Sequence, residues 1–348
     1  EARIALLTSV KPAYSSLINY LQTLAQKAGT VDGVWRFKDG DKFYATRLAR
    51  ITTTDYSAEK IHNLGLSEVE RIHNEMKAIM KKVGFKGDLQ QFFTFMRDDA
   101  QFYYPDTAEG KAAYLAEATR VIDVMKGKLD ELFLVKPKAD MVVKAVEPFR
   151  EQSAGKAFYE QPSMDGSRPG VFYANLYNIK ATPKFSMKTL AVHEGIPGHH
   201  FQIAIQQELK GLPTFRNILP FTVYAEGWAL YTERLMAELG LYKDDPFGDL
   251  GRLQAELFRA IRLVVDTGIH HKRWSREQAI AYMSGNAGMA KSDVESEIER
   301  YIVMPGQACA YKVGMMKLLE LRSKAQQELG DKFKLTDFHD VVLQNGSM

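Results

Sequence analysis

Apolar side chains recur every three or four residues along most of this 348-residue chain, and this period is the strongest constraint on its fold. An α-helix makes one turn in 3.6 residues, so this spacing lines one helix face with apolar side chains. The pattern predicts helices over residues 11–28, 67–82, 107–129, 184–209, 220–239, 249–267, 275–284, 291–302 and 306–328. Ser67 is the expected start of the second of these helices, because serine is favoured at helix N-termini. The sequence therefore predicts a mainly α protein.

The segment 151–184 departs from the helical period. It is rich in Gly, Ser and Pro, and it contains a run of aromatic and branched residues at 171–179, bounded by Pro169-Gly170 and Pro183. Such residues between turn formers favour β-strands. We therefore expect one or two strands of a small sheet, placed just before the most informative motif of the chain.

The composition excludes several classes of protein. The chain has 46 basic and 43 acidic residues, for a formal net charge of +3, whereas a nucleic-acid binder usually carries a large basic excess. No apolar stretch approaches the ~18 residues that a membrane span needs. The single cysteine, Cys309, excludes an intramolecular disulfide and a four-cysteine metal site. We expect it to be a buried structural thiol.

The strongest functional signal is the octapeptide His-Glu-Gly-Ile-Pro-Gly-His-His at 193–200, which holds three of the eight histidines. Catalytic zinc sites combine neutral imidazoles and carboxylates, and leave one coordination position for water. In the helical motif H-E-x-x-H, histidines one turn apart bind the metal and the glutamate acts as general base. His193 and Glu194 match the first two positions of that motif.

Pro197 stands where the helical motif needs its second histidine. On an ideal helix His199 lies about 120° around and ~9 Å along from His193, and His200 lies ~10.5 Å along, so neither could share a metal with it. Pro197 disrupts a helix and the glycines beside it accept unusual dihedral angles. A bulge that absorbs two residues would bring His199 into place, and one that absorbs three would bring His200. The smaller distortion favours His199.

An ordinary kinked helix with solvent-facing histidines is the alternative interpretation. It is the weaker one, because two glycines and a proline would cost a plain helix ~4–5 kcal/mol. The third metal ligand has to come from another segment, and Glu226 is the candidate. Its neighbours are apolar, so its carboxylate needs a partner, either a metal or a basic side chain. Glu233 lies on the same helix face and is expected to accept the second N–H of a histidine ligand, or to be an ordinary helix glutamate.

These motifs resemble the bacterial DUF885 family of uncharacterised, zinc-metallopeptidase-like proteins, which are often described as lipoproteins. The family hallmark His-Glu-x-x-Pro-Gly-His-His is found at 193–200, and further family signatures follow in order at 61–72, 172–175, 226–231, 266–274 and 301–314. The resemblance covers nearly the whole chain. The chain is similar to the C-terminal portion of family members that carry a further N-terminal helical region.

The resemblance implies a large helical, zincin-like domain of the gluzincin type, with a small β-sheet beside the active-site helix. It also implies one zinc ion bound by His193, His199 and Glu226, with Glu194 as the base, and a periplasmic or cell-envelope location. We expect one continuous domain, in which residues 1–150 form a helical wall of the cleft and residues 151–348 form the catalytic region.

Metal-assisted hydrolysis of a peptide or small amide is the predicted function. Glu194 would take a proton from metal-activated water and pass it to the leaving nitrogen. His270 and Tyr311 are the candidate donors to the oxyanion, although each could equally be an ordinary packed residue. A non-catalytic, zinc-stabilised helical binding protein is one alternative function, and an esterase or other amidohydrolase is another. A structural zinc site has four protein ligands, so a glutamate beside the first histidine favours catalysis.

Three further residues and one strand are candidates for substrate binding. Arg168, Arg273 and Lys312 could hold a substrate carboxylate, which would make the enzyme a carboxypeptidase. The strand at 172–178 could pair its main chain with an extended peptide, or could be an ordinary core strand.

Overall fold

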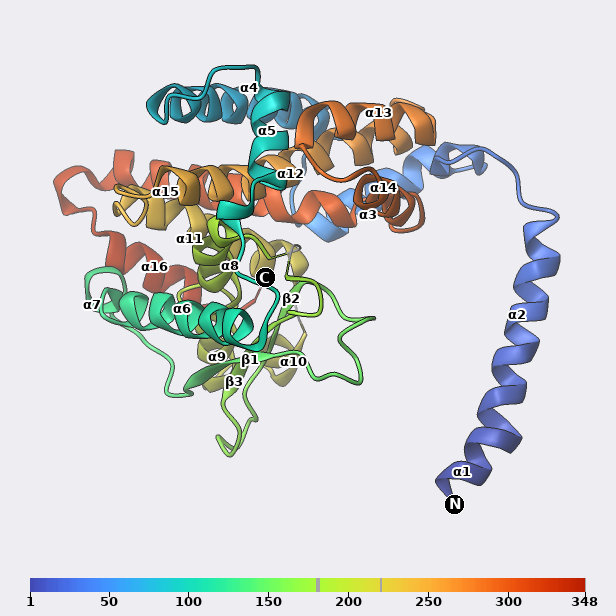
Figure 1. Ribbon diagram of the computed structural model, residues 1–348, viewed down its shortest axis with the longest axis horizontal. Coiled ribbons are helices and arrows are strands. Elements are labelled where there is room, and N and C mark those ends of the chain that lie inside the picture. Colours follow the sequence, from blue (N-terminus) through green and yellow to red (C-terminus); the bar gives the residue numbers. More distant parts are fainter. Residues whose placement is uncertain (180–181, 220, 348) are drawn as a thin grey trace.

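The computed structural model describes residues 1–179, 182–219 and 221–347, and it is mainly helical with one small sheet (Figure 1). The first helices are α1 (Ala2–Ala5), α2 (Lys11–Ala25), α3 (Gly40–Thr52), α4 (Ala58–Lys82), α5 (Leu89–Asp98), α6 (Ala108–Lys126) and α7 (Leu129–Leu132). After the sheet follow α8 (Lys184–Glu194), α9 (His199–Glu208), α10 (Thr214–Ile218), α11 (Thr222–Glu238), α12 (Pro246–His270), α13 (Arg276–Ala287), α14 (Lys291–Val303), α15 (Ala310–Leu329) and α16 (Leu335–Gln344). The predicted mainly α class is confirmed.

Two large apolar cores hold most of these helices together, and a smaller cluster packs α3 against α4, α12 and α15. One core joins α4, α5, α12, α13 and α14. The other joins α6, the sheet, α8, α9, α11, α15 and α16, so all three segments with predicted metal ligands belong to it. Both cores contain residues from either side of residue 150, and the division into a helical wall and a catalytic region stays a prediction.

Two close helix contacts position elements of the two cores, one contact in each. On α4, a Cβ at Gly65 would lie 2.7 Å from Val264 Cγ2 of α12. On α11, a Cβ at Gly227 would lie 2.6 Å from the Cα of Gly314 in α15. Because neither glycine has a side chain, the paired helices approach closely. The second contact fixes α11 against α15 one residue after Glu226.

The helix at the N-terminus does not pack on either core. α1, a π-helical turn at Leu6–Val10 and α2 extend away from the other helices (Figure 1). The apolar stripe predicted for 11–28 is present on this arm, but every residue from 2 to 25 is exposed. Amphipathic periodicity thus predicted the helix without showing whether its apolar face is covered.

Several predicted helix boundaries were wrong. α4 begins nine residues before Ser67, because Ser57 accepts the N–H of Lys60 at 3.1 Å and the apolar face continues upstream through Ile61. The predicted helix 184–209 is two helices, α8 and α9. The sequence pattern missed α3, and it missed α5 despite a capping box between Asp88 and Gln91. Residue 220, where another predicted helix begins, lies outside the described residues.

The sheet has three strands in the order β1-β3-β2: β1 (Met141–Ala145) is parallel to β3 (Gly170–Ala174), and β2 (Ala157–Glu160) is antiparallel to it. All residues of β3 are buried, which explains its continuous apolar run. The predicted strand is therefore confirmed, but its suggested peptide-binding edge is wrong, since both edges of β3 are already paired. The Asn175 side chain instead donates to main-chain carbonyls of the preceding loop, including that of Glu151 at 2.7 Å.

Two other sequence-based expectations can be compared with the fold. Cys309 is fully buried, as predicted. Among the described residues, no helix combines the length and the apolar character that crossing a bilayer requires.

Two buried histidines make stability depend on pH. Burial lowers the pKa of His200 and that of His339 to about 4. His339 is hydrogen-bonded to Tyr231 Oη at 2.7 Å and to the Leu132 carbonyl at 2.9 Å, so the fold selects its neutral form. The unfolded chain takes up protons near pH 6.5, whereas the folded chain does not until about pH 4. Acidification through this window therefore favours unfolding.

We expect the free energy of unfolding to fall by up to about 3 kcal/mol per histidine between pH 6.5 and pH 4. Urea unfolding at a series of pH values measures this dependence. In His339→Gln, whose amide can keep one donor and one acceptor but cannot titrate, the slope should be shallower. Equal unfolding free energies at pH 7 and pH 5 in the unaltered chain would contradict the assignment.

Candidate metal centre

The segment Gly195–Gly198 separates α8 from α9 and places one histidine on each side of the break. α8 ends at Glu194, and Gly195 has φ −106° and ψ −112°. Gly198 has φ −78° and ψ −127°, and its N–H donates to the carbonyl of Val192 at 3.0 Å. The peptide bond between Ile196 and Pro197 is cis. We predicted a bulge in a continuous helix, but the chain ends the helix and starts a new one.

Gly198 lies directly against the end of α8. A Cβ at this position would be 2.1 Å from the His193 carbonyl oxygen and 2.3 Å from that of Val192. Both contacts are with backbone atoms, so a side chain would have to displace the loop. The absence of a Cβ therefore allows His199 to return beside His193.

A hydrogen bond ties this loop to the helix that carries Glu226. The indole N–H of Trp228, a fully buried residue of α11, donates to the Pro197 carbonyl at 2.8 Å. Trp228 is two residues from Glu226, so the same helix segment holds the loop and supplies the third predicted ligand. The sequence analysis did not identify this role of Trp228.

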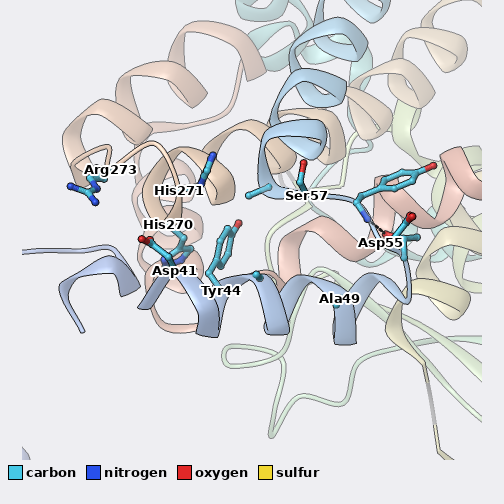
Figure 2. Close-up of a pocket in the computed structure, with 12 residues that line it drawn as sticks. Asp41, Tyr44, Ala49, Asp55, Ser57, His270, His271 and Arg273 are labelled. Carbon is cyan, nitrogen blue, oxygen red and sulfur yellow. Dashed lines mark hydrogen bonds between the residues drawn. The ribbon is translucent and has the colours of Figure 1, made fainter. Parts of the chain in front are cut away.

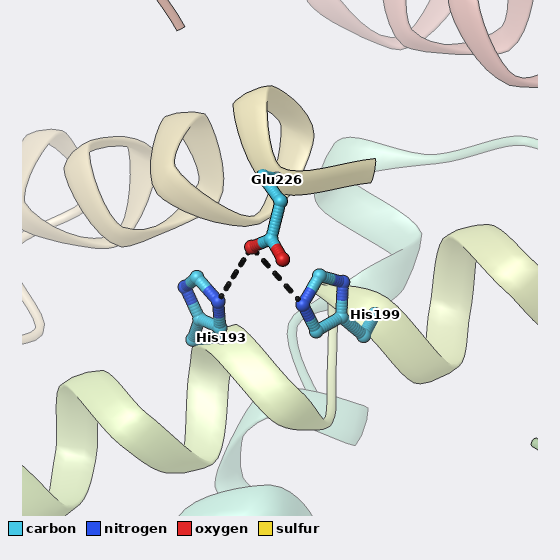
Figure 3. A group of neighbouring side chains, drawn as sticks. All are labelled: His193, His199 and Glu226. Atoms are coloured by element: carbon cyan, nitrogen blue, oxygen red, sulfur yellow. Dashed lines mark ion pairs between the residues drawn. The ribbon is translucent and has the colours of Figure 1, made fainter. Parts of the chain in front are cut away.

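The three predicted ligands converge on one point (Figure 3). Potential ligand atoms of His193, His199 and Glu226 all lie within 4.8 Å of one another. Glu226 Oε2 is 3.4 Å from Nε2 of His193 and 3.5 Å from Nε2 of His199. Two ligand atoms in a tetrahedral zinc site, each about 2.0–2.1 Å from the metal, lie about 3.3 Å apart. The spacing of these side chains therefore fits a zinc ion.

The hydrogen bonds around the cluster fit a metal as well. Glu226 Oε2 is buried and has no hydrogen-bond partner, which is unfavourable for a carboxylate unless a cation contacts it. His193 Nδ1 lies 2.7 Å from Glu233 Oε1, which leaves Nε2 directed to the centre of the cluster. The structure thus places Glu233 behind the candidate ligand His193, where it fixes the orientation of the ring.

Carboxylates dominate the electrostatics of the cluster. Burial lowers the pKa of His193, but Glu226, Glu233 and Glu194 outweigh this effect and raise it to about 10. Burial raises the pKa of Glu226, but the two histidines outweigh it and hold that pKa well below its usual range. The cluster is therefore a site of negative potential that favours a bound cation.

His200 is turned away from the cluster. Its Nδ1 is 3.0 Å from Tyr159 Oη in β2, and its Nε2 is 3.1 Å from the Ala139 carbonyl. Both ring nitrogens are occupied, so His200 supports the sheet. Of the two histidines that the sequence left open as second ligand, only His199 reaches the cluster.

Glu194 is the last residue of α8 and is 8% exposed. Its charge acts on His193, but it does not belong to the group of converging ligand atoms. In the part of the chain that the structure describes, no hydrogen bond or salt bridge occupies its carboxylate. Glu194 is therefore a free acceptor beside the cluster, which is what a general base requires.

His270 cannot take the predicted role of donor to the oxyanion. It is fully buried at the end of α12, with Nδ1 3.2 Å from the N–H of Val34 and Nε2 2.9 Å from the Tyr301 carbonyl. Both ring nitrogens are used in holding the 3₁₀ turn Val34–Arg36 and α14 against α12, so His270 has no donor left for an oxyanion. We therefore remove it from the candidate catalytic residues.

Tyr311 lies one helix turn from a contact that adjoins Glu226. It lies in the first turn of α15, three residues before Gly314, which contacts the residue after Glu226. It also packs against the core that contains α8 and α11, and it is only partly buried. Its role as an oxyanion donor stays a prediction.

The predicted carboxylate anchors are used elsewhere or lie apart from the cluster. Lys312 is fully buried between Glu256 at 2.6 Å and Glu68 at 2.7 Å, so its charge is already compensated. Arg168 is exposed and lies 3.6 Å from Glu160. Arg273 stacks near Trp35. These positions do not support anchoring of a substrate at the three ligands.

Arg273 and His270 instead line a separate pocket of about 580 Å³ between α3, the start of α4 and the end of α12 (Figure 2). Tyr44, on the pocket wall, donates a hydrogen bond to the buried Asp266 at 2.5 Å. None of the three cluster residues lines this pocket. Its residues therefore do not form part of the candidate metal centre.

Comparison with known proteins identifies relatives of this chain. The sequence model of a family described as "Bacterial protein of unknown function (DUF885)" matches residues 1–348. No curated protein matches the chain. A putative lipoprotein of Colwellia psychrerythraea has a solved structure that is similar with a TM-score of 0.95 at 44% identity, over 99% of this chain and 59% of that one.

A second solved structure, of a putative lipoprotein of unknown function from Shewanella oneidensis, is similar with a TM-score of 0.79 at 20% identity. The similarity covers 96% of this chain and 61% of that one, and it concerns the fold alone. This chain thus spans about three fifths of the length of both relatives.

Gly198→Ala should weaken zinc binding at least tenfold, because the new methyl group overlaps the His193 carbonyl and moves His199 away from its partners. Titration of zinc against a competing chelator measures the affinity. Gly285→Ala is the matched control, since a Cβ at Gly285 has no neighbour within 4 Å. An affinity of the Gly198→Ala chain equal to that of the control would show that this contact does not organise the site.

Glu233→Gln should lower zinc affinity by about 10–100-fold, because a neutral amide holds the His193 ring less firmly and makes its nitrogen less basic. Glu70→Gln, at an exposed position of α4, is the matched control. The same competition titration measures both variants. If the two variants bind zinc equally, Glu233 does not support the cluster.

Proposed function

This chain belongs to the bacterial DUF885 family, and we propose that it is a zinc-dependent hydrolase that cleaves peptide bonds. The observation that carries the proposal is the convergence of His193, His199 and Glu226 within 4.8 Å, beside the unoccupied carboxylate of Glu194. Two imidazoles and one carboxylate form the ligand set of a catalytic zinc site with an open position. The gluzincin-type zincin relationship is part of this proposal.

Each residue of the cluster has a chemical role in this proposal. Zinc bound by the three ligands would polarise a substrate carbonyl and lower the pKa of a bound water toward neutrality. Glu194 would accept a proton from water at the site and deliver it to the leaving nitrogen. Glu233 keeps the His193 ring in the tautomer whose Nε2 lone pair faces the ligand position. Tyr311 is the remaining candidate for donation to the oxyanion.

Two alternative functions predict different properties. A zinc-stabilised binding protein needs a fourth protein ligand, whereas the cluster found among the described residues has three members. An esterase or another amidohydrolase would use the same residues, and a panel of ester and amide substrates distinguishes it from a peptidase. The relatives of known structure are described as putative lipoproteins, and we infer a cell-envelope location for this chain as well.

Glu194→Gln should retain about one zinc per chain but lower kcat on a peptide substrate by about 10²–10⁴-fold, because the amide cannot accept a proton. His193→Ala should lose both zinc and activity. Metal analysis and peptide hydrolysis followed by mass spectrometry measure these effects, with Glu70→Gln as the control. Full activity in a zinc-loaded Glu194→Gln chain would disprove the mechanism.

A further inference from the structure

Arg259 and Arg262 are two cationic side chains of α12 that form no salt bridge within the described residues. Arg262 is 2% exposed, and the Nε atoms of both residues are buried without a hydrogen-bond partner. Over the described ranges, neither guanidinium forms a salt bridge with any Asp or Glu. Arg252 on the same helix shows the usual arrangement, with Asp249 at 2.7 Å and Glu256 at 3.3 Å.

The contacts that these arginines do make leave donors free. Arg262 Nη2 is 3.4 Å from Gln307 Oε1, and Arg259 Nη1 is 3.3 Å from the carbonyl of Ala255 in its own helix. The guanidinium carbon of Arg262 lies 4.1 Å from the ring centroid of Tyr311, and that of Arg259 lies 5.9 Å from it. Contacts with an aromatic ring hold a guanidinium without using its in-plane N–H groups.

Glu297 is the acidic residue whose charge acts on Arg262, and it has other partners. Glu297 lies 3.4 Å from Arg300 and accepts a hydrogen bond from Tyr301. A buried cation is expensive unless an anion or several acceptors compensate it. The free donors of Arg259 and Arg262, one turn apart on α12, therefore form a site that lacks its anion.

Tyr311 connects this arginine pair to the metal centre. Its ring contacts both guanidiniums, and its helix turn adjoins the contact between Gly314 and Gly227, directly after Glu226. Tyr311 also packs against the core that holds α8 and α11. Through Tyr311, the pair is therefore linked to the helix turn that adjoins the third ligand.

We propose that Arg259 and Arg262 bind the C-terminal carboxylate of the peptide that is cleaved at the metal centre, so that the substrates are peptides with a free C-terminus. A guanidinium matches a carboxylate in shape and charge and can donate two parallel hydrogen bonds to it. This inference rests on the proposed hydrolase function, and it specifies the class of substrate.

The test compares a peptide that ends in a free carboxylate with the same peptide ending in an amide. The unaltered, zinc-loaded chain should hydrolyse the acid with a kcat/KM about 100-fold above that of the amide, since the amide removes one charge of a buried pair. In Arg262→Gln and Arg259→Gln the ratio of kcat/KM for the acid to kcat/KM for the amide should fall to about three or less. Arg168→Gln and Arg273→Gln, as matched controls, should keep it. Zinc content and thermal unfolding establish that each variant is folded.

Binding gives a second measurement that does not depend on turnover. Calorimetric titration of zinc-loaded Glu194→Gln with the two peptides should show that the acid binds at least about tenfold more tightly. Equal affinities, or equal hydrolysis of both peptides by the unaltered chain, would overturn the inference. If neither peptide is hydrolysed, the proposed function fails, while the difference in affinity still decides whether the arginines bind a carboxylate. If Arg262→Gln does not fold, Arg259→Gln and the acid-to-amide ratio of the unaltered chain decide the question.

Discussion

The contact of Gly198 with the carbonyl oxygens at the end of α8 determines where the second histidine lies. An ordinary helix would carry His199 away from His193 both around and along its axis. The chain instead stops α8, turns through four residues and starts α9 at His199 itself. Trp228 then ties this turn to α11 close to Glu226. One backbone contact and one side-chain hydrogen bond thus position three elements that are separate in sequence.

The composition of the candidate site could be predicted from sequence because its chemistry is local. His193, Glu194 and His199 stand within seven residues, and the glycines and proline between them mark a break in the helix. The form of the break could not be predicted, because glycine accepts many dihedral angles and the packed neighbours select among them. The position of His200 depends on Tyr159 and Ala139, which are distant in sequence.

Residues whose role depends on long-range partners were harder to predict. His270 is fixed by Val34 and Tyr301, and Lys312 by Glu68 and Glu256. Neither set of partners has a sequence signature. The arginine pair of α12 was not predicted from the sequence, because the lack of a counter-ion can be recognised only in the folded chain. The small sheet shows the same limit, because one strand was recognisable but its place between two others was not.

Cys309 has a practical consequence for spectroscopic work on this protein. The thiol is fully buried, and burial together with Asp266 raises its pKa well above the usual range, so little reactive thiolate forms at neutral pH. Maleimide dyes and spin labels therefore have no competing target in the folded chain. A cysteine introduced on the exposed arm, for example at Tyr14, becomes a unique attachment point without removal of the native residue. The surroundings of that arm can then be followed in solution with a single label.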